Sequence, residues 1–398
     1  MDLASDDRRS REISRRGLLH LGLLGVAGSG WFFGPNGRLE AAPDEPGRDD
    51  RAMIVRSRRP LNLESPIAAL EHRLTPNEAF FVRSHFGAPA IDLAPWDVEV
   101  TGLVSRPSRL TLADLERLEQ ATKTAVLQCA GNGRGLYRPR VPGVPWERGA
   151  VGQAEWSGAR LADVLDRAGI ESGAAHVHFV GGDAPPSPKT PAFVRSIPLD
   201  RARDPATILA LRMNGEPLPV LHGGPVRLVV PGWAGNNWFK WIRRIVVARD
   251  EAPGPYMQTS YRMPRTPVPP GAAPGAVPMD PVTWMNVKSL VAWPERGRVL
   301  PAGPVEIRGI AWTGQGHVTK VDVRIDREGE WQSATLLGEP ELGAWRPWRL
   351  RWESPSRGRH VIEVRAADSM GQVQPESPAW NRSGYLWNGF DTGACEVR

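Results

Sequence analysis

The chain has 398 residues, of which 41% are hydrophobic and 24% are charged. This composition is typical of a globular protein, and the length exceeds what one hydrophobic core usually organises, so we expect two or three domains. The net charge is +6 and arginine supplies most of the cations. No Lys/Arg-rich tract with interleaved aromatic residues occurs, which argues against nucleic acid as a partner and favours small anions.

Residues 1–41 have the features of an export signal. Arg15 and Arg16 precede a short, glycine-containing apolar stretch at 21–27, and 39–41 offers a small-residue cleavage site. Paired arginines before a weakly hydrophobic core are typical of twin-arginine signals, and the stretch is too short to span a membrane. The pattern predicts a periplasmic protein that is exported by the twin-arginine pathway, with no membrane span in the mature chain.

The next two regions differ in pattern. Residues 42–75 are polar and punctuated by proline, so we expect an N-terminal arm there. Over 76–250 short apolar runs alternate with helix-like segments, which predicts a mixed α+β domain. A capping box begins a helix at Thr111, and a second helix is expected over 161–168. Strands are expected at 96–100, 176–180, 226–230 and 241–247.

The C-terminal part changes character twice. Residues 251–281 contain repeated prolines and glycines, a composition that favours a connector running over the surface. Over 282–398 apolar and polar residues alternate with period two in several short segments, which predicts an immunoglobulin-like β-sandwich. The expected fold class is therefore α+β, a mixed α/β domain followed by an all-β sandwich.

Cys129 lies where the apolar run 124–127 ends in a glycine-containing loop. A thiol at a strand end, with glycines that let a ligand approach and Arg134 nearby to favour the thiolate, suits a metal ligand. A packed, inert cysteine is the alternative. The other cysteine, Cys395, lies in the predicted sandwich, so no disulfide scaffold is expected. The chain has no Cys-X-X-Cys-His motif, which excludes a c-type haem attached to it.

Six motifs occur in the order that is found in the sulfite oxidase family, and the similarity extends from about Leu74 to Phe390. The resemblance implies a molybdenum cofactor with one pterin dithiolene, and by motif position Cys129 is the protein thiolate on the metal. It also implies that the C-terminal sandwich makes a homodimer contact. The motifs are FVRSH (81–85), LQCAGN (127–132), WSGARL (156–161), HGGPVR (222–227), VPGW (230–233) and KWIRR (240–244).

The resemblance also assigns residues to the pterin. Arginine and lysine suit its phosphate, while His222 and Asp183 suit its polar edge. On local grounds alone, His222 reads as a loop histidine and Asp183 as a turn residue. The implied cofactor-binding positions are Phe81, Val82, Arg83, Ser84, His85, Asp183, His222, Arg227, Trp238, Phe239 and Lys240.

In the family, a cluster of arginines holds the oxidised substrate, a small anion. Arg83 and Arg134 stand at the matching positions, and a guanidinium offers a planar donor fork to an oxyanion. The third arginine position is taken by Ser383, with Arg382 one residue earlier, and a shift of one residue on a strand turns a side chain away. Trp156 matches a substrate-pocket position, although a tryptophan there reads equally well as core.

The larger departure is Phe193, which stands where the family has a tyrosine whose hydroxyl reaches the substrate. Loss of that hydrogen bond removes about 1–3 kcal/mol if it is charge-assisted, which corresponds to tenfold or more in rate. Arg195 is also unexpected, and it resembles the bacterial sulfane dehydrogenase branch. Two residues apart on a strand, Phe193 and Arg195 share a face.

These observations leave more than one function open. The first is oxidation of sulfite or a related sulfur oxyanion by oxygen-atom transfer, with electrons passed to a separate acceptor, a c-type cytochrome. The second keeps the cofactor but acts on sulfane sulfur or another substrate. A nitrate reductase is disfavoured because no haem or flavin module follows. A metal-free exported binding protein explains the sandwich but not Cys129. Molybdenum content of the purified protein separates the last hypothesis from the others.

Overall fold

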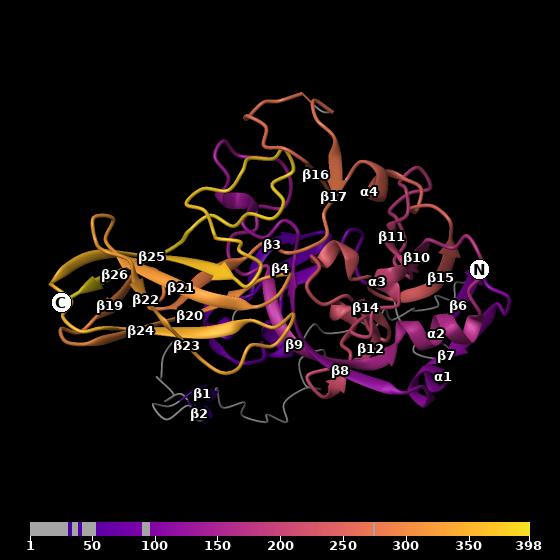
Figure 1. Ribbon diagram of the computed structural model, residues 1–398, viewed down its shortest axis with the longest axis horizontal. Helices are drawn as coiled ribbons and strands as arrows, with labels where there is room; N and C mark the ends of the chain where they lie inside the picture. Colours follow the sequence, from indigo (N-terminus) through magenta and orange to yellow (C-terminus); the bar gives the residue numbers. More distant parts are fainter. Residues whose placement is uncertain (1–30, 34–38, 42–52, 90–95, 274) are drawn as a thin grey trace, which may run out of the picture.

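The computed structural model describes residues 31–33, 39–41, 53–89, 96–273 and 275–398. In Figure 1 a larger unit lies beside an elongated β-sandwich that is formed by the C-terminal residues. Arg15 and Arg16 lie outside the described residues, as does most of the predicted export signal; within it the structure describes only the hairpin of β1 (Trp31–Phe33) and β2 (Leu39–Ala41). None of the described helices is both long enough and apolar enough to cross a membrane.

The larger unit contains two main sheets. The first has five strands in the order β11-β10-β15-β6-β7, and only the β15–β6 pair is parallel. Val98 and Val100 of β6, and Val177 and Phe179 of β10, are buried and alternate with partly exposed residues, because successive side chains of a strand point to opposite faces. The strands are β6 (Asp97–Gly102), β7 (Ser108–Thr111), β10 (His176–Gly181), β11 (Val194–Pro198) and β15 (Ile242–Ala248).

The second sheet has the order β13-β12-β9-β8, with β14 paired to β12. Its centre is buried on both faces, and residues 125–128 at the end of β8 are all buried. This apolar run ends directly at Cys129, so the sheet fixes the position of the thiol. The strands are β8 (Gln120–Gln128), β9 (Val151–Arg160), β12 (Ile208–Met213), β13 (Glu216–Pro217) and β14 (Arg227–Val229).

The helices are short and follow local sequence signals. In α1 (Leu112–Arg117) the Thr111 side chain accepts from the Asp114 N–H while Asp114 accepts from the Thr111 N–H, which confirms the predicted capping box. The predicted helix at 161–168 is α2 (Leu161–Ala168), which buries one apolar face and ends at Gly169 with φ 72°. The remaining helical segments are α3 (Leu199–Ala202), α4 (Pro255–Gln258), η1 (Ile67–Glu71), η2 (Asn77–Ala79), η3 (Arg134–Leu136), η4 (Val220–His222) and η5 (Gly235–Asn237).

Two segments are more ordered than the sequence predicts. Residues 53–75, expected as a polar arm, form β3 (Ile54–Arg58) and β4 (Leu61–Glu64), which join β5 (Val82–Arg83) in a three-stranded sheet. Glu64 of β4 is 1% exposed, and its carboxylate accepts from the backbone of Glu147 and Gly149. A buried carboxylate with these donors is satisfied, which explains how a polar sequence packs inside.

The predicted connector also contains structure. Within 251–281 lie α4 and the antiparallel pair β16 (Arg262–Pro264) and β17 (Met279–Pro281). Just before β16, Tyr261 has φ 55°, a conformation that costs energy for a bulky residue. Backbone hydrogen bonds hold it, because its carbonyl accepts from the Val282 N–H at 2.8 Å and its N–H donates to the Tyr385 hydroxyl at 3.2 Å.

The C-terminal unit is a two-sheet sandwich, in agreement with the predicted fold class. Inward-facing residues of the two sheets, among them Val321, Val323, Ile362 and Val364, form its core together with Cys395. One sheet has the order β18-β20-β24-β23 and the other β19-β26-β25-β21-β22. The strands are β18 (Lys288–Trp293), β19 (Arg298–Leu300), β20 (Val305–Trp312), β21 (Val318–Ile325), β22 (Gln332–Ser333), β23 (Thr335–Leu336), β24 (Arg346–Trp352), β25 (Gly358–Asp368) and β26 (Asp391–Val397).

The sandwich closes over the loop that follows β8. Trp312 of β20 donates its Nε1–H to the Gln128 side chain at 2.9 Å, and the Leu386 N–H donates to the Ala130 carbonyl at 2.8 Å. Gly133, with φ 88°, lies so close to Trp387 that a Cβ there would fall 2.7 Å from that side chain. The thiol loop is therefore packed against the C-terminal segment and depends on it for its shape.

The same interface buries charge. Arg148 of the larger unit forms an ion pair with Asp391 of β26, and both are buried. Nearby, Lys288 of β18 is 2% exposed, and its Nζ has no hydrogen-bond partner among the described residues. Its ammonium lies 4.8 Å from the Trp387 ring centroid and 5.8 Å from that of Trp312. Burial lowers the pKa of Lys288 to about 7.

This lysine predicts a pH-dependent cost to stability. Its folded-state pKa lies below its unfolded value, so the penalty for burying the charge is complete below about pH 7 and disappears as the pH rises to the unfolded pKa, changing by about 1.4 kcal/mol per unit. Lys288→Met should therefore raise the melting temperature by a few degrees near pH 7, and this gain should shrink towards pH 10. Thermal unfolding over that range checks it. The exposed Lys189→Met is the control, and a gain that stays constant with pH would contradict the assignment.

Candidate active site

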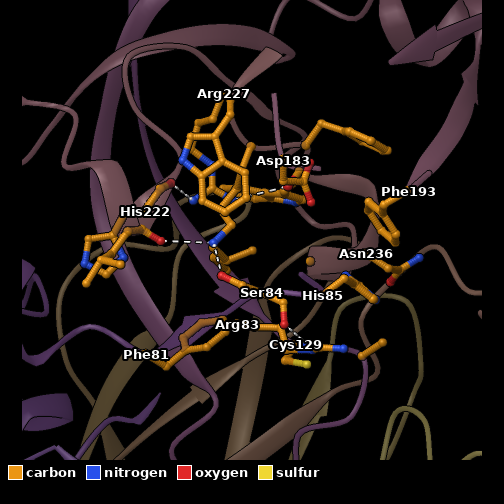
Figure 2. A pocket seen from close by; sticks show the side chains of 18 of the residues that line it. Phe81, Arg83, Ser84, His85, Cys129, Asp183, Phe193, His222, Arg227 and Asn236 are labelled. Atoms are coloured by element: carbon orange, nitrogen blue, oxygen red, sulfur yellow. Dashed lines mark hydrogen bonds between the residues drawn. The ribbon is translucent and has the colours of Figure 1, made fainter. Parts of the chain in front are cut away.

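A pocket of about 740 Å³, including its open mouth, lies in the larger unit where several strands and short helices end. Figure 2 shows side chains from β5, from the end of β8, from η4 and from β14 converging on it. Most of the residues predicted from the sequence line this pocket. Its walls consist of Phe81, Arg83, Ser84, His85, Leu127, Cys129, Ala130, Asp183, Phe193, Leu221, His222, Arg227, Gly235, Asn236, Trp238, Phe239, Lys240, Trp241 and Tyr261.

Cys129 supplies the thiol at one end of the pocket (Figure 2). It follows β8 directly and is partly exposed rather than packed away. Its N–H donates to the Ala150 carbonyl at 2.9 Å, and its Sγ accepts from the Gly131 N–H at 3.4 Å. The sulfur therefore lines the pocket with one backbone donor directed at it, and a cysteine in such a position can bind a metal as the thiolate.

Arg227 supplies a buried charge at the other end. Its guanidinium carbon lies 4.9 Å from the Trp156 ring and 5.7 Å from the Trp238 ring. It donates to the His222 carbonyl at 2.5 Å and to the Trp238 carbonyl at 3.4 Å, while its Nε has no partner. It forms no ion pair with any described residue. Burial lowers its pKa to about 9.

Lys240 lies beside it. Its Nζ donates to the Ser84 hydroxyl at 3.1 Å and to the Leu221 carbonyl at 3.0 Å. Burial, and then the charge of Arg227, lower its pKa well below the usual value. Like Arg227, Lys240 forms no ion pair with a carboxylate in the part of the chain that the structure describes. A buried cation and a partly buried one, with no counter-charge in contact, form a site that an anion stabilises.

Two histidines carry neutral donor and acceptor groups. His222 Nε2 lies 2.8 Å from the Asn77 carbonyl, and burial lowers its pKa to about 4. His85 Nε2 lies 2.7 Å from the Tyr261 hydroxyl, and burial followed by the charge of Arg83 lowers its pKa well below 6.5. Because a carbonyl only accepts, Nε2 of His222 carries the proton and Nδ1 remains an acceptor. Both rings are neutral near pH 7.

Asp183 and Phe193 lie across the pocket from His222, on the side of His85 (Figure 2). Asp183 follows β10, and burial raises the pKa of its carboxyl. The Phe193 ring stacks on His85 with centroids 4.0 Å apart and also contacts Phe239 at 5.2 Å. Phe193 therefore forms an apolar wall that positions the His85 imidazole rather than presenting a polar group.

Two sequence-predicted residues lie one layer behind the wall. Val82 is buried in β5, where it pairs with Leu63. Trp156 is completely buried, and its Nε1–H donates to the Ala125 carbonyl at 3.2 Å. Trp156 thus supports the Arg227 guanidinium from behind and belongs to the core, which was one of the two readings of the sequence.

Three predicted arginines are not on the wall. Arg134 donates through Nε to the Ser383 carbonyl at 2.8 Å and lies over the Tyr385 ring. Arg195 is 1% exposed and donates to the Tyr256 carbonyl and, at 3.2 Å, to the Asn237 side chain. Arg382 is exposed. Main-chain acceptors and aromatic rings hold the first two guanidinium groups, so of the predicted substrate arginines only Arg83 reaches the pocket.

The pocket also contains residues that the sequence did not single out. Leu127 and Ala130 belong to the same motif as Cys129, and Asn236 of η5 lies between two other motifs. Their position in or near these motifs could have indicated them. Tyr261 had no such signal, because it lies in the segment predicted as a connector. Its hydroxyl contacts His85, its ring stacks on Tyr385 with centroids 5.2 Å apart, and burial raises its pKa to about 12. The other wall residues that were not predicted are Leu221, Gly235 and Trp241.

Comparison with known proteins identifies the class. A model of an oxidoreductase molybdopterin binding domain matches residues 85–256, and a model of a Mo-co oxidoreductase dimerisation domain matches 280–392. The first match contains Cys129, Arg227 and Lys240. The protein is therefore a molybdopterin-dependent oxidoreductase, and its cofactor is molybdenum–molybdopterin.

Whole-chain relatives identify the family. Sulfite oxidase of Gallus gallus is 38% identical over 84% of this chain and 76% of its own, and sulfite oxidase of Arabidopsis thaliana is 33% identical over 89% and 95%. Among solved structures, the sulfane dehydrogenase SoxCD of Paracoccus pantotrophus matches with a TM-score of 0.73 and 30% identity over 84% of each chain. This chain belongs to the sulfite oxidase family. It spans 64% of the mitochondrial sulfite oxidase of Mus musculus.

Proposed function

We propose that this enzyme oxidises sulfite or a related small sulfur oxyanion in the pocket beside Cys129. The observation that carries the proposal is the layout of the pocket, which has a partly exposed thiol at one end and, at the other, buried Arg227 and partly buried Lys240 without a carboxylate in contact. Arg83 lies on the wall, and the planar donor fork of a guanidinium suits a dianionic substrate and product. Relatives that are named sulfite oxidases support the substrate class.

The residues fit the cofactor. Cys129 would be the one protein thiolate on the metal, and Arg227 with Lys240 would bind the phosphate of the pterin, which satisfies the unpartnered Nε of Arg227. His222 and Asp183 offer an acceptor nitrogen and a carboxyl to the polar edge of the pterin. When bound, the cofactor accepts two electrons and mediates transfer of an oxygen atom that comes from water.

The net reaction is balanced as sulfite plus water giving sulfate, two protons and two electrons. Arg83 offsets the negative charge of the oxyanion, and Phe81, Phe193 and Trp238 keep most of the wall apolar, which strengthens that interaction. The electrons must leave the chain, and we propose a separate c-type cytochrome as their acceptor.

We also propose that the enzyme is exported and acts in the periplasm. The paired arginines near the N-terminus support export by the twin-arginine pathway and a periplasmic location. Recovery of the cofactor-loaded chain in the periplasmic fraction is the observation that would support it, whereas retention in the cytoplasm would count against it. The match of 280–392 to a dimerisation domain supports a homodimer formed through the sandwich.

A second candidate function rests on Phe193. The apolar ring at this position favours a less polar group than an oxyanion, such as sulfane sulfur, and the likeness to the sulfane dehydrogenase SoxCD is in line with that. Arg195, the other argument for this branch, is buried behind the wall and hydrogen-bonded to Asn237. Of these two residues, only Phe193 therefore supports the second candidate.

Sulfite oxidation with ferricyanide as acceptor tests the choice. We expect the molybdenum-loaded parent to turn over sulfite, and Phe193→Tyr to change kcat/KM by less than about tenfold, because the Phe193 ring acts by packing on His85. An inactive parent with an active Phe193→Tyr variant would favour the second candidate. A metal-free preparation from a host that makes the cofactor would contradict both.

A further inference from the structure

Residues 385–388, which we call the cover, lie on the loop after β8 at the metal-binding end of the pocket. The Leu386 N–H donates to the Ala130 carbonyl at 2.8 Å, and Trp387 lies so close to Gly133 that no side chain fits there. The side chains of Leu386 and Trp387 are 7% and 8% exposed. Because Cys129 begins this loop, the loop cannot change shape unless the cover moves.

A few side-chain contacts hold the other side of the cover. The Asn286 side chain donates to the Leu386 carbonyl at 3.1 Å, and the Asn388 side chain donates to the Val287 carbonyl at 3.4 Å. Leu386 itself has φ 51°, a conformation that costs energy for a bulky residue and persists only where surrounding contacts determine it. The closed conformation of the cover therefore depends on its contacts with the loop after β8 and with the start of β18.

Lys288, at the start of β18, packs against the cover. Its ammonium lies 4.8 Å from the centroid of the Trp387 ring, and its Nζ has no hydrogen-bond partner among the described residues. The charged groups that act on it are Asp391 of β26, Arg148 before β9 and Glu64 of β4. Asp391 is already paired with Arg148, and Glu64 accepts from backbone N–H groups. The charge of the lysine is therefore buried without a carboxylate in contact, which is unfavourable.

Movement of the cover would relieve this burial. When Trp387 leaves its place, the ammonium loses an aromatic contact and becomes accessible to water, which stabilises a charged lysine more than an aromatic ring does. A neutral amine gains much less from water, so it leaves the cover closed. The two protonation states of Lys288 therefore favour different positions of the cover.

We propose that Lys288 acts as a pH-sensitive latch on the cover: protonation of its amine favours the open cover, and deprotonation favours the closed one. The latch controls how readily the loop that carries Cys129 is uncovered. It does not depend on which substrate the enzyme oxidises, so the inference goes beyond the proposed function.

The two states of the cover define the pH window. Burial lowers the pKa of Lys288 to about 7 in the closed state, whereas a hydrated lysine has a pKa of about 10.4. Because the closed-state pKa is the lower one, the closed cover is most stable at high pH. It loses stability as the pH falls, by about tenfold in the closing equilibrium per pH unit, and the loss is complete below about pH 7.

Amide hydrogen exchange of the full-length, cofactor-free protein tests the latch. Protection of peptides that contain 385–388 or 129–135, corrected for the intrinsic effect of pH, should rise by about tenfold per pH unit above about pH 7. In Lys288→Met the protection should already be higher at pH 7, by about tenfold or more, and should not vary with pH. Lys288→Gln is a second neutral variant. The exposed Lys189→Met is the control and should behave like the parent.

Peptides from β25 in the core of the sandwich distinguish the latch from a general loss of stability. A gain in protection that is larger in the cover than in β25 supports a local opening. An equal gain in both regions would mean that Lys288 destabilises the whole fold, and the latch would be wrong. The same pH dependence of cover protection in the parent and in both neutral variants would also overturn the inference.

Discussion

The Cys129→Ser variant should retain the pterin and lose turnover to background. Arg227 and Lys240 lie at the other end of the pocket from the thiol, and the substitution does not change them. The phosphate of the pterin therefore keeps its contacts with these two residues. A cysteine binds a metal as the thiolate, and the Gly131 N–H is directed at this sulfur, whereas a serine hydroxyl does not ionise near neutral pH. Pterin content, molybdenum content and single-turnover sulfite oxidation, measured on one preparation, check the prediction.

Cys395→Ser is the control for that experiment. Cys395 is 3% exposed in β26 within the sandwich core, and burial raises its pKa, so it is an inert thiol. This variant should lose some stability and keep its activity per molybdenum. An active Cys129→Ser enzyme would show that the Cys129 thiol is not required for the reaction, whatever the outcome for Cys395.

The Arg227→Met variant should lose the cofactor. The guanidinium is the more deeply buried of the two cations, and a charge-assisted contact to a phosphate is worth about 2–3 kcal/mol, which corresponds to roughly a hundredfold in affinity. Molybdenum and pterin measured after gel filtration should therefore fall sharply. Arg243→Met is the matched control, because Arg243 also lies over a tryptophan, at 3.5 Å from the Trp96 ring, but outside the pocket.

Stability of the cofactor-free protein distinguishes a binding defect from misfolding. Burial depresses the pKa of Arg227 to about 9. Near neutral pH the guanidinium is still charged, and burying this charge lowers the stability of the fold. Methionine fills a similar volume between Trp156 and Trp238 without that penalty. The cofactor-free variant should thus melt at the same temperature as the cofactor-free parent or higher. A lower melting temperature together with full cofactor content would contradict the assignment of Arg227 to the anion site.

The elements with strong local signals could be predicted from the sequence. The capping box at Thr111, helix α2 with its terminal Gly169 and the alternating strands of the sandwich need only short-range physics. The position of Cys129 at the end of β8 follows from the apolar run before it. The cofactor-binding residues near motifs, such as Lys240, were predicted by resemblance, because their chemistry is clear only when they converge.

The substrate shell could not be predicted, because it depends on the direction of long side chains. Arg134 and Arg195 stand in suitable places along the chain, but Tyr385, Tyr261 and main-chain carbonyls hold their guanidinium groups elsewhere. No local pattern reveals such partners, which are distant in sequence. Tyr261 was missed for the same reason, since a proline-rich composition predicts a connector and says nothing about one tyrosine within it.

The packing of the C-terminal segment against the loop after β8 has a consequence for biosynthesis. Ala130 receives its backbone partner from Leu386, and Gly133 is covered by Trp387, more than 250 residues later in the chain. A nascent chain that has not reached these residues has a complete β8 but an uncovered thiol loop. Synthesis from the N-terminus therefore completes the metal-binding end of the pocket only once Leu386 and Trp387 have been made and can fold back onto this loop.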